Sequence, residues 1–168
     1  MSFHKIVVAL DDSVLSKSVF TQAIALAKTA QASLLLFSGI SNELMAQPAM
    51  LPAEIGVFTG DLMSSNYQAQ YAAIEQQTAA MQGVLQKYYD AAKAAELAVE
   101  TTFKVGDVES LLCEVAEAWG ADLIVVGRRG RTGLSEALLG SVSNYAVHHA
   151  HCSVLVVQGE VEPETSEL

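Results

Sequence analysis

The sequence predicts an α/β fold in which a five-stranded parallel sheet is covered by helices on both faces. Five short apolar segments alternate with helical segments or a long loop, an order that requires parallel strands joined by right-handed crossovers. Apolar residues make up 51% of the 168 residues and charged residues only 17%, which provides a full core. We expect one domain over residues 1–159 and a flexible acidic tail over 160–168.

Two strands and a helix are predicted in the first quarter of the chain. Apolar runs over residues 6–10 and 34–37 read as buried strands, closed by Asp11-Asp12-Ser13 and by Ser38-Gly39. Between them, Ser16 is the expected N-cap of a helix. Its apolar stripe at helical spacing consists of Phe20, Ala23, Ile24 and Ala27.

A long loop and a long helix follow. Residues 41–65 show no steady periodicity and contain Pro48, Pro52, Gly56 and Gly60, which predicts a loop, and loops of this length are functional lids or disordered segments. From Tyr67 to Ala92 a stripe recurs at alternating spacings of four and three residues. Such spacing is typical of a coiled-coil seam and of a helix lying on a sheet. We favour packing on the sheet, because the seam is short and includes Thr78 and Ala92.

The remaining elements complete the βα series. Residues 99–104 alternate apolar and polar side chains, which predicts a half-exposed edge strand. Gly106-Asp107 is expected to cap a helix that Gly120 ends. A buried strand over 123–126, a helix from about Ser141 to His149 and a strand over 154–157 follow.

A positively charged glycine loop is the most informative feature of the chain. All three arginines lie within segment 127–133, while the whole protein has a net charge of -10. The cluster Gly140-Ser141-Val142-Ser143 then opens a helix. Glycines allow the backbone to approach a ligand closely, and the first N–H groups of a helix attract anions. In parallel α/β sheets ligands bind beyond the carboxyl ends of the strands, where Asp11, Ser38 and Gly127 all lie. We therefore predict a phosphate-binding site at this edge.

The spacing of the glycines is neither that of a Walker A motif nor that of the dinucleotide fingerprint G-x-G-x-x-G. Two residues separate Gly127 from Gly130, and nine separate Gly130 from Gly140-Ser141. This pattern resembles the G-2x-G-9x-G-[S/T] signature of the ATP-binding branch of the universal stress protein family. The opening strand with its terminal Asp, 6–11, the turn 105–107 and the closing strand 152–157 resemble that family as well.

The resemblance implies an adenine nucleotide α-hydrolase-like, Rossmann-type fold with strand order 3-2-1-4-5, and a stress-related sensor or regulator that binds ATP, or another adenine nucleotide, with Mg²⁺. By the same resemblance, the loop would wrap the ribose and phosphates, Asp11 would face the ribose or Mg²⁺, and backbone groups would border the adenine. The implied nucleotide-binding residues are Ala9, Leu10, Asp11, Ser38, Val126, Gly127, Arg129, Gly130, Gly140, Ser141, Val142 and Ser143.

Two positions depart from the family pattern. Asp12 places a second negative charge near the polyphosphate, which weakens ATP binding or demands Mg²⁺. Ser153 stands where the family usually has Pro, which changes only local backbone stiffness.

Two alternatives remain open at this point. The first is an enzyme, a nucleotide hydrolase or nucleotidyl-transferring protein in which Asp11 holds Mg²⁺. The second is a binding protein for AMP or a cyclic nucleotide. No catalytic residue is predicted, since the sequence has no Gly-x-Ser-x-Gly elbow. His148, His149 and His151 beside Cys152 are interpreted as complements of a helix dipole rather than as zinc ligands.

Composition also limits the partners. The acidic net charge argues against nucleic acid, and no apolar stretch approaches the ~18–20 residues needed to cross a membrane. The sequence starts without a signal peptide, so we expect a cytoplasmic protein. Strand 154–157 is continuously apolar at an expected sheet edge, which predicts a homodimer through that strand. A regulatory protein partner is left open, and the sequence does not identify one.

Overall fold

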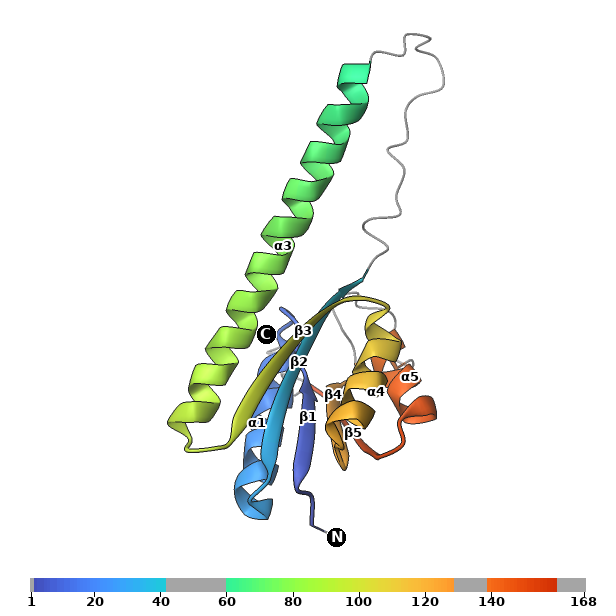
Figure 1. Cartoon of the computed structure of the whole chain (residues 1–168). Coiled ribbons are helices and arrows are strands. Elements are labelled where there is room, and N and C mark those ends of the chain that lie inside the picture. Colours follow the sequence, from blue (N-terminus) through green and yellow to red (C-terminus); the bar gives the residue numbers. More distant parts are fainter. Residues whose placement is uncertain (1, 42–59, 129–138, 160–168) are drawn as a thin grey trace, which may run out of the picture.

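A computed structural model describes residues 2–41, 60–128 and 139–159 of the chain (Figure 1). The structure confirms the five-stranded sheet and its order, β3-β2-β1-β4-β5, with every neighbouring pair parallel. The elements, in chain order, are β1 (Lys5–Ala9), α1 (Leu15–Ala30), β2 (Ser33–Ser41), α3 (Gly60–Ala94), β3 (Val99–Gly106), α4 (Val108–Trp119), β4 (Leu123–Gly127), α5 (Ser141–His149) and β5 (Ser153–Val157).

Two apolar clusters form the core, one on each face of the sheet. Helices α1 and α3 cover one face, where Phe20 and Leu85 pack on Leu36 and Val125. Helices α4 and α5 cover the other, where Leu112 and Ala146 belong to the cluster around Phe37. Figure 1 shows these two helix pairs on opposite sides of the sheet. The strand alternation therefore sends consecutive side chains into different clusters.

Strand β2 is longer than the sequence predicts. The expected closing turn at Ser38-Gly39 is wrong, because the strand continues to Ser41. Its last residues pair with β3, from Ser38 opposite Phe103 to Ser41 opposite Gly106, although the last β1 pairing is Ala9 with Phe37. Strand β2 therefore extends past the end of β1 with a partner on one side only.

The start of α1 also differs from the prediction. The helix begins at Leu15, with Val14 at the N-cap position and no capping side-chain hydrogen bond. Ser16 lies inside the first turn and is buried, so its prediction as N-cap is wrong. Its hydroxyl instead bonds to Asp11, both as donor to Oδ1 and as acceptor from the backbone N–H.

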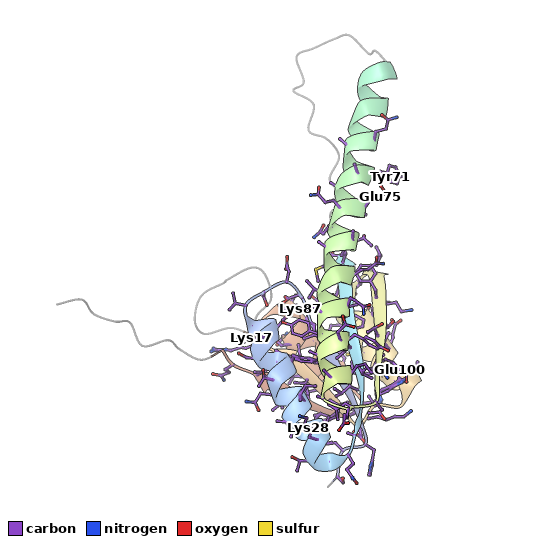
Figure 2. All side chains as sticks on the ribbon, turned by 90° about the vertical axis from the view of Figure 1, so that its left-hand side faces the viewer. Lys17, Lys28, Tyr71, Glu75, Lys87 and Glu100 are labelled. Atoms are coloured by element: carbon purple, nitrogen blue, oxygen red, sulfur yellow. The ribbon has the colours of Figure 1, made fainter. Side chains whose placement is uncertain are left out.

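Helix α3 packs on the sheet along only part of its length. It begins at Gly60, inside the predicted loop 41–65; residues 42–59 lie outside the described part of the chain. Its 35 residues span about 52 Å, and Figures 1 and 2 show its N-terminal half extending beyond the sheet. Met81, Leu85 and Ala92 are buried, whereas Tyr71, labelled in Figure 2, is 66% exposed. The sheet-packing interpretation of the stripe is thus correct for its second half alone.

The remaining predictions concern element ends and edges. Strand β3 is an edge of the sheet, as predicted, and β5 is the other edge. Gly120 ends α4 in the left-handed conformation at φ 73°, which confirms it as the helix stop. Asp107 occupies the N-cap position of α4, as predicted, but among the described residues its side chain makes no capping hydrogen bond to the backbone. Within the described residues, no helix has the length and apolar character that a membrane span requires. The acidic tail 160–168 is outside the described residues.

Candidate functional site

A cleft of about 480 Å³ lies at the carboxyl ends of the central strands. It sits between β1 and β4, where the order of the strands along the sheet reverses, the position at which open parallel sheets bind ligands. Its volume falls within the usual range of small-molecule sites. Three strand ends, three helix starts and one residue of α3 form its walls: Ala9, Leu10, Asp11, Ser13, Leu15, Ser16, Val19, Phe37, Gly39, Ile40, Ser41, Gln77, Asp107, Val108, Glu109, Val126, Gly127, Gly140, Ser141, Val142 and Ser143.

Three helix N-termini converge on this cleft, those of α1, α4 and α5. The first N–H groups of a helix have no partner within the helix, and they carry the positive end of its dipole. Gly140 takes the extended N-cap conformation of α5, with φ -64° and ψ 163°. Ser141 and Val142 follow as the first helical residues, so their N–H groups are available to an anion in the cleft.

Hydrogen bonds fix the two described ends of the glycine loop to each other. The N–H of Gly140 donates to the carbonyl of Arg128 at 2.7 Å, and the N–H of Arg128 donates to the carbonyl of Val157 at 2.8 Å. The buried hydroxyl of Ser143 lies 3.0 Å from the carbonyl oxygens of both Arg128 and Gly140. Because the Gly140 N–H and the Ser143 hydroxyl are engaged here, the hydroxyl that α5 leaves open to a ligand is that of Ser141.

The glycine at position 127 lies in close contact with α1. A Cβ atom built there would lie 2.8 Å from Cδ2 of Leu15, closer than real side chains approach. Leu15 belongs to the first turn of α1 and itself lines the cleft. The sequence pattern predicts this glycine as a position where the backbone approaches a ligand, and the structure shows a close contact between β4 and α1.

Asp11 organises the turn between β1 and α1. Its Oδ1 accepts hydrogen bonds from the N–H of Ser13 at 2.9 Å, from the hydroxyl of Ser13 and from the hydroxyl of Ser16 at 2.7 Å. Among the described residues, no donor is recorded on Oδ2. Burial raises the pKa of Tyr88 on α3, and the nearby Asp11 carboxylate raises it further, so the phenol stays neutral beside that carboxylate.

The overhang of β2 offers backbone groups to the cleft. The carbonyl of Phe37 accepts from the N–H of Leu10, and the N–H of Ser33 donates to His4, so odd-numbered residues of β2 direct their backbone toward β1. Gly39 follows the same alternation, but β1 has already ended. Its N–H and C=O therefore face the cleft. Ser38 points its backbone toward β3, and within the described part of the chain its buried hydroxyl has no hydrogen-bond partner. It does not line the cleft.

Two of the three acidic residues of the cleft lie at the start of α4. Asp107 and Glu109 line it together with Asp11. Within the described residues, no three His, Cys, Asp or Glu side chains are grouped closely enough to hold a metal ion, and the cluster at His148–Cys152 is included in that finding. Burial raises the pKa of the thiols of Cys113 and Cys152, so neither is an activated nucleophile.

The structure brings most of the predicted site residues together. Those that line the cleft are Ala9, Leu10, Asp11, Val126, Gly127, Gly140, Ser141, Val142 and Ser143. Ser38 does not, while Arg129 and Gly130 lie outside the described residues. Sequence reasoning missed Gly39, Ile40, Gln77 and Val108, which also form the walls. The apolar residue Ile40, directly after Gly39, could have indicated from the sequence that β2 continues past Gly39.

The open parallel sheet, with a cleft at its switch point, places this protein among the doubly wound α/β proteins. The profile of the universal stress protein family matches residues 2–158, and the chain therefore belongs to that family. Universal stress protein Sll1388 of Synechocystis is 38% identical over 161 residues, which cover 94% of this chain and 99% of that protein. YxiE of Bacillus subtilis is 32% identical over 159 residues, 93% of this chain and 99% of that one.

Solved structures show the same fold at low identity. Protein MJ0577 matches with a TM-score of 0.74 and 19% identity, over 96% of this chain and 100% of that chain. A universal stress protein in complex with cAMP matches at 0.59 and 22%, over 94% and 98%. The Arabidopsis thaliana family member At3g01520, with AMP bound, matches at 0.58 and 16%, over 98% and 97%.

Proposed function

We propose that this universal stress protein binds ATP in the cleft and acts as a stress-related sensor or regulator. The observation that carries the proposal is the convergence of the α1, α4 and α5 N-termini on one cleft at the switch point of the sheet. Backbone N–H groups and helix dipoles at such a point suit a polyphosphate, which needs several donors at once. The AMP and cAMP in the two similar structures support an adenine nucleotide as the ligand class.

The chemistry of the cleft suits the three parts of a nucleotide. The first turn of α5, after Gly140, suits the phosphates. The carboxylate of Asp11 suits ribose hydroxyls, which are donors. The apolar side chains of Ile40 and Val108, with the backbone of Gly39 between them, suit a flat base. Arg129 and Gly130 are proposed to complete the phosphate site from the loop that lies outside the described residues.

Magnesium is proposed to enter with the nucleotide. Mg²⁺ is commonly bound by one or two carboxylates together with substrate phosphates. Asp11 lines the cleft and supplies one carboxylate; no three-ligand protein group exists among the described residues. The ion would therefore depend on the phosphates, and it would reduce the repulsion between the polyphosphate and the acidic side chains.

Hydrolysis is proposed to be slow or absent in the isolated protein. The titratable side chains among the cleft residues are Asp11, Asp107 and Glu109. Asp11 already accepts three hydrogen bonds on Oδ1, which suits a positioning role better than proton transfer. The alternative of a Mg²⁺-dependent hydrolase or nucleotidyl transferase requires turnover by pure protein that disappears in Asp11→Asn.

Titration calorimetry tests the proposal directly. ATP should bind with micromolar to submillimolar affinity, more tightly with Mg²⁺ than without it, while AMP and cAMP measured in parallel show which adenine nucleotide is preferred. Gly130→Val should abolish binding and leave the fold intact, and Arg129→Ala should weaken binding more than Arg131→Ala. No heat with any of these nucleotides at millimolar concentration would remove the proposal.

The protein is further proposed to form a homodimer through β5. This strand is an edge of the sheet, and its Val154, Leu155 and Val156 are only half-buried in the single chain. Antiparallel pairing with the same strand of a second copy would satisfy its outward backbone groups about a two-fold axis. A regulatory protein partner and a cytoplasmic location complete the proposed function.

A further inference from the structure

The cleft has two chemically different ends, and this difference orients a nucleotide. Helix α5 packs on β4 and β5, whereas α3 packs on β2 and β3, toward the opposite edge of the sheet (Figure 1). At the α5 end, Gly140 and Ser141 contribute no acidic side chain; at the other end, Asp107 and Glu109 do. Phosphates are attracted to the first end, where no carboxylate opposes the helix N-terminus, and repelled from the second, where two carboxylates oppose the N-terminus of α4. On the proposed function, on which this inference rests, the base therefore points toward β2, α3 and α4.

The end of the cleft toward β2, α3 and α4, called the base end below, is enclosed from both faces of the sheet. Val108 of α4 approaches on one face, where its Cγ2 would lie 3.1 Å from a Cβ atom at Gly39. On the other face, Gln77 of α3 reaches the cleft, which Ile40 also lines. The backbone of Gly39, unpaired with β1, lies at the level of the sheet between them. A planar base inserted there would meet Gly39 at its edge, with apolar contacts on either side.

Gln77 is the polar side chain that α3 contributes to this end. Of the described residues in α3, it alone lines the cleft, and it is half-buried. Among the described residues, none is recorded in a hydrogen bond with its amide. A half-buried amide gains from a partner that both donates and accepts, since its carbonyl is an acceptor and its NH₂ group a donor. Adenine presents this combination, because its 6-amino donor lies beside ring-nitrogen acceptors.

We propose that Gln77 is a specificity-determining residue that selects adenine, its side-chain carbonyl accepting a hydrogen bond from the 6-amino group. The base then has two recognition elements, the backbone edge of β2 and the side chain of α3. A neutral hydrogen bond of this kind changes affinity about fivefold. The effect is confined to ligands that carry the amino group.

The test compares ATP with purine riboside triphosphate, which lacks the 6-amino group, on wild type and three variants. Wild type should bind ATP about fivefold more tightly than the analogue. In Gln77→Ala the ratio should fall to about one, whereas Gln77→Glu should keep the preference, because a carboxylate also accepts from the amino group. Gln76→Ala is the matched control: Gln76 is exposed on the same helix and does not line the cleft, so its ratio should equal that of wild type.

The ratio of the two affinities separates a loss of adenine recognition from a structural effect of the substitution. A purely structural effect of Gln77→Ala would lower both affinities equally, and Ala is the best helix former, so the helix is retained. An unchanged ratio in Gln77→Ala, or a wild type that binds both ligands equally well, would overturn the role of Gln77 while leaving nucleotide binding in place. A wild type that binds neither ligand would overturn the proposed function, and this inference with it.

Discussion

Gly127 at the end of β4 lies directly against Leu15 in the first turn of α1. A Cβ atom at Gly127 would be 2.8 Å from Cδ2 and 3.1 Å from Cγ of Leu15. This contact joins two walls of the cleft, because both residues line it. The glycine that begins the proposed phosphate-binding motif therefore also allows the close approach of the first helix to the fourth strand.

Gly127→Ala should consequently destabilise the protein by about 1–3 kcal/mol, the usual cost of overpacking. The measurement is urea unfolding followed by circular dichroism. In a Leu15→Ala background the two shortest contacts are removed and only Cγ2 of Val19, at 3.3 Å, remains close, so the same substitution should cost clearly less. Equal costs in the two backgrounds would show that Leu15 is not the reason for the glycine.

The hydroxyl of Ser143 holds the ends of the glycine loop together. It is 1% exposed and lies 3.0 Å from the carbonyl oxygen of Arg128. Ser143→Ala should lower stability by about 1 kcal/mol, the contribution of one hydrogen bond. It should also weaken ATP binding, because the start of α5 is then less firmly placed. Ser141→Ala is the matched control, since Ser141 is exposed: stability should not change, although ATP affinity should fall.

Two glycines on the protein surface should respond to alanine in opposite ways. A Cβ atom at Gly83 within α3, or at Gly120 after α4, would meet no heavy atom within 4 Å beyond its immediate surroundings in the chain, so sterics do not distinguish them. Gly83 has helical geometry, and Gly83→Ala should stabilise the protein by about 1 kcal/mol. Gly120 has φ 73°, and Gly120→Ala should destabilise it by about 1–2 kcal/mol.

Thermal unfolding of both variants checks this pair. If Gly83→Ala has no effect, the part of α3 around Gly83 contributes nothing to the cooperative unit that unfolds. If Gly120→Ala is neutral, the left-handed conformation is not maintained in solution.

The glycine spacing and the strand ends were sufficient to locate the cleft from the sequence. Asp11 and the start of α5 were identified because their residue types act locally, as turn and helix-start signals. Ser16 and Ser38 were misassigned because tertiary contacts decide their positions. The hydroxyl of Ser16 donates a hydrogen bond to Asp11, and Ser38 pairs with Phe103 within the sheet. Gln77 was not predicted because its position depends on where α3 crosses the sheet, which periodicity does not specify.

The final prediction concerns dimer formation through the open edge of β5. The strand geometry suggests a variant that changes this edge without disturbing the pairing of β5 with β4. Ser153 and Val157 exchange backbone hydrogen bonds with the β4 side, through Asp122 and Arg128, so odd-numbered residues of β5 face β4. The N–H groups of Val154 and Val156 therefore face outward. Val156→Pro removes one outward donor without breaking the β4–β5 ladder, and proline is tolerated at such edge positions.

Sedimentation velocity at micromolar concentration should find wild type as a dimer and Val156→Pro as a folded monomer. Val156→Lys should also split the dimer or cause aggregation, but its charge would disturb the α4–α5 cluster in which Val156 packs. Val105→Lys is the control, because Val105 is 46% exposed on the other edge strand and should leave the dimer intact. A wild type that sediments as a monomer, or a Val156→Pro variant that remains dimeric, would show that β5 does not form the interface.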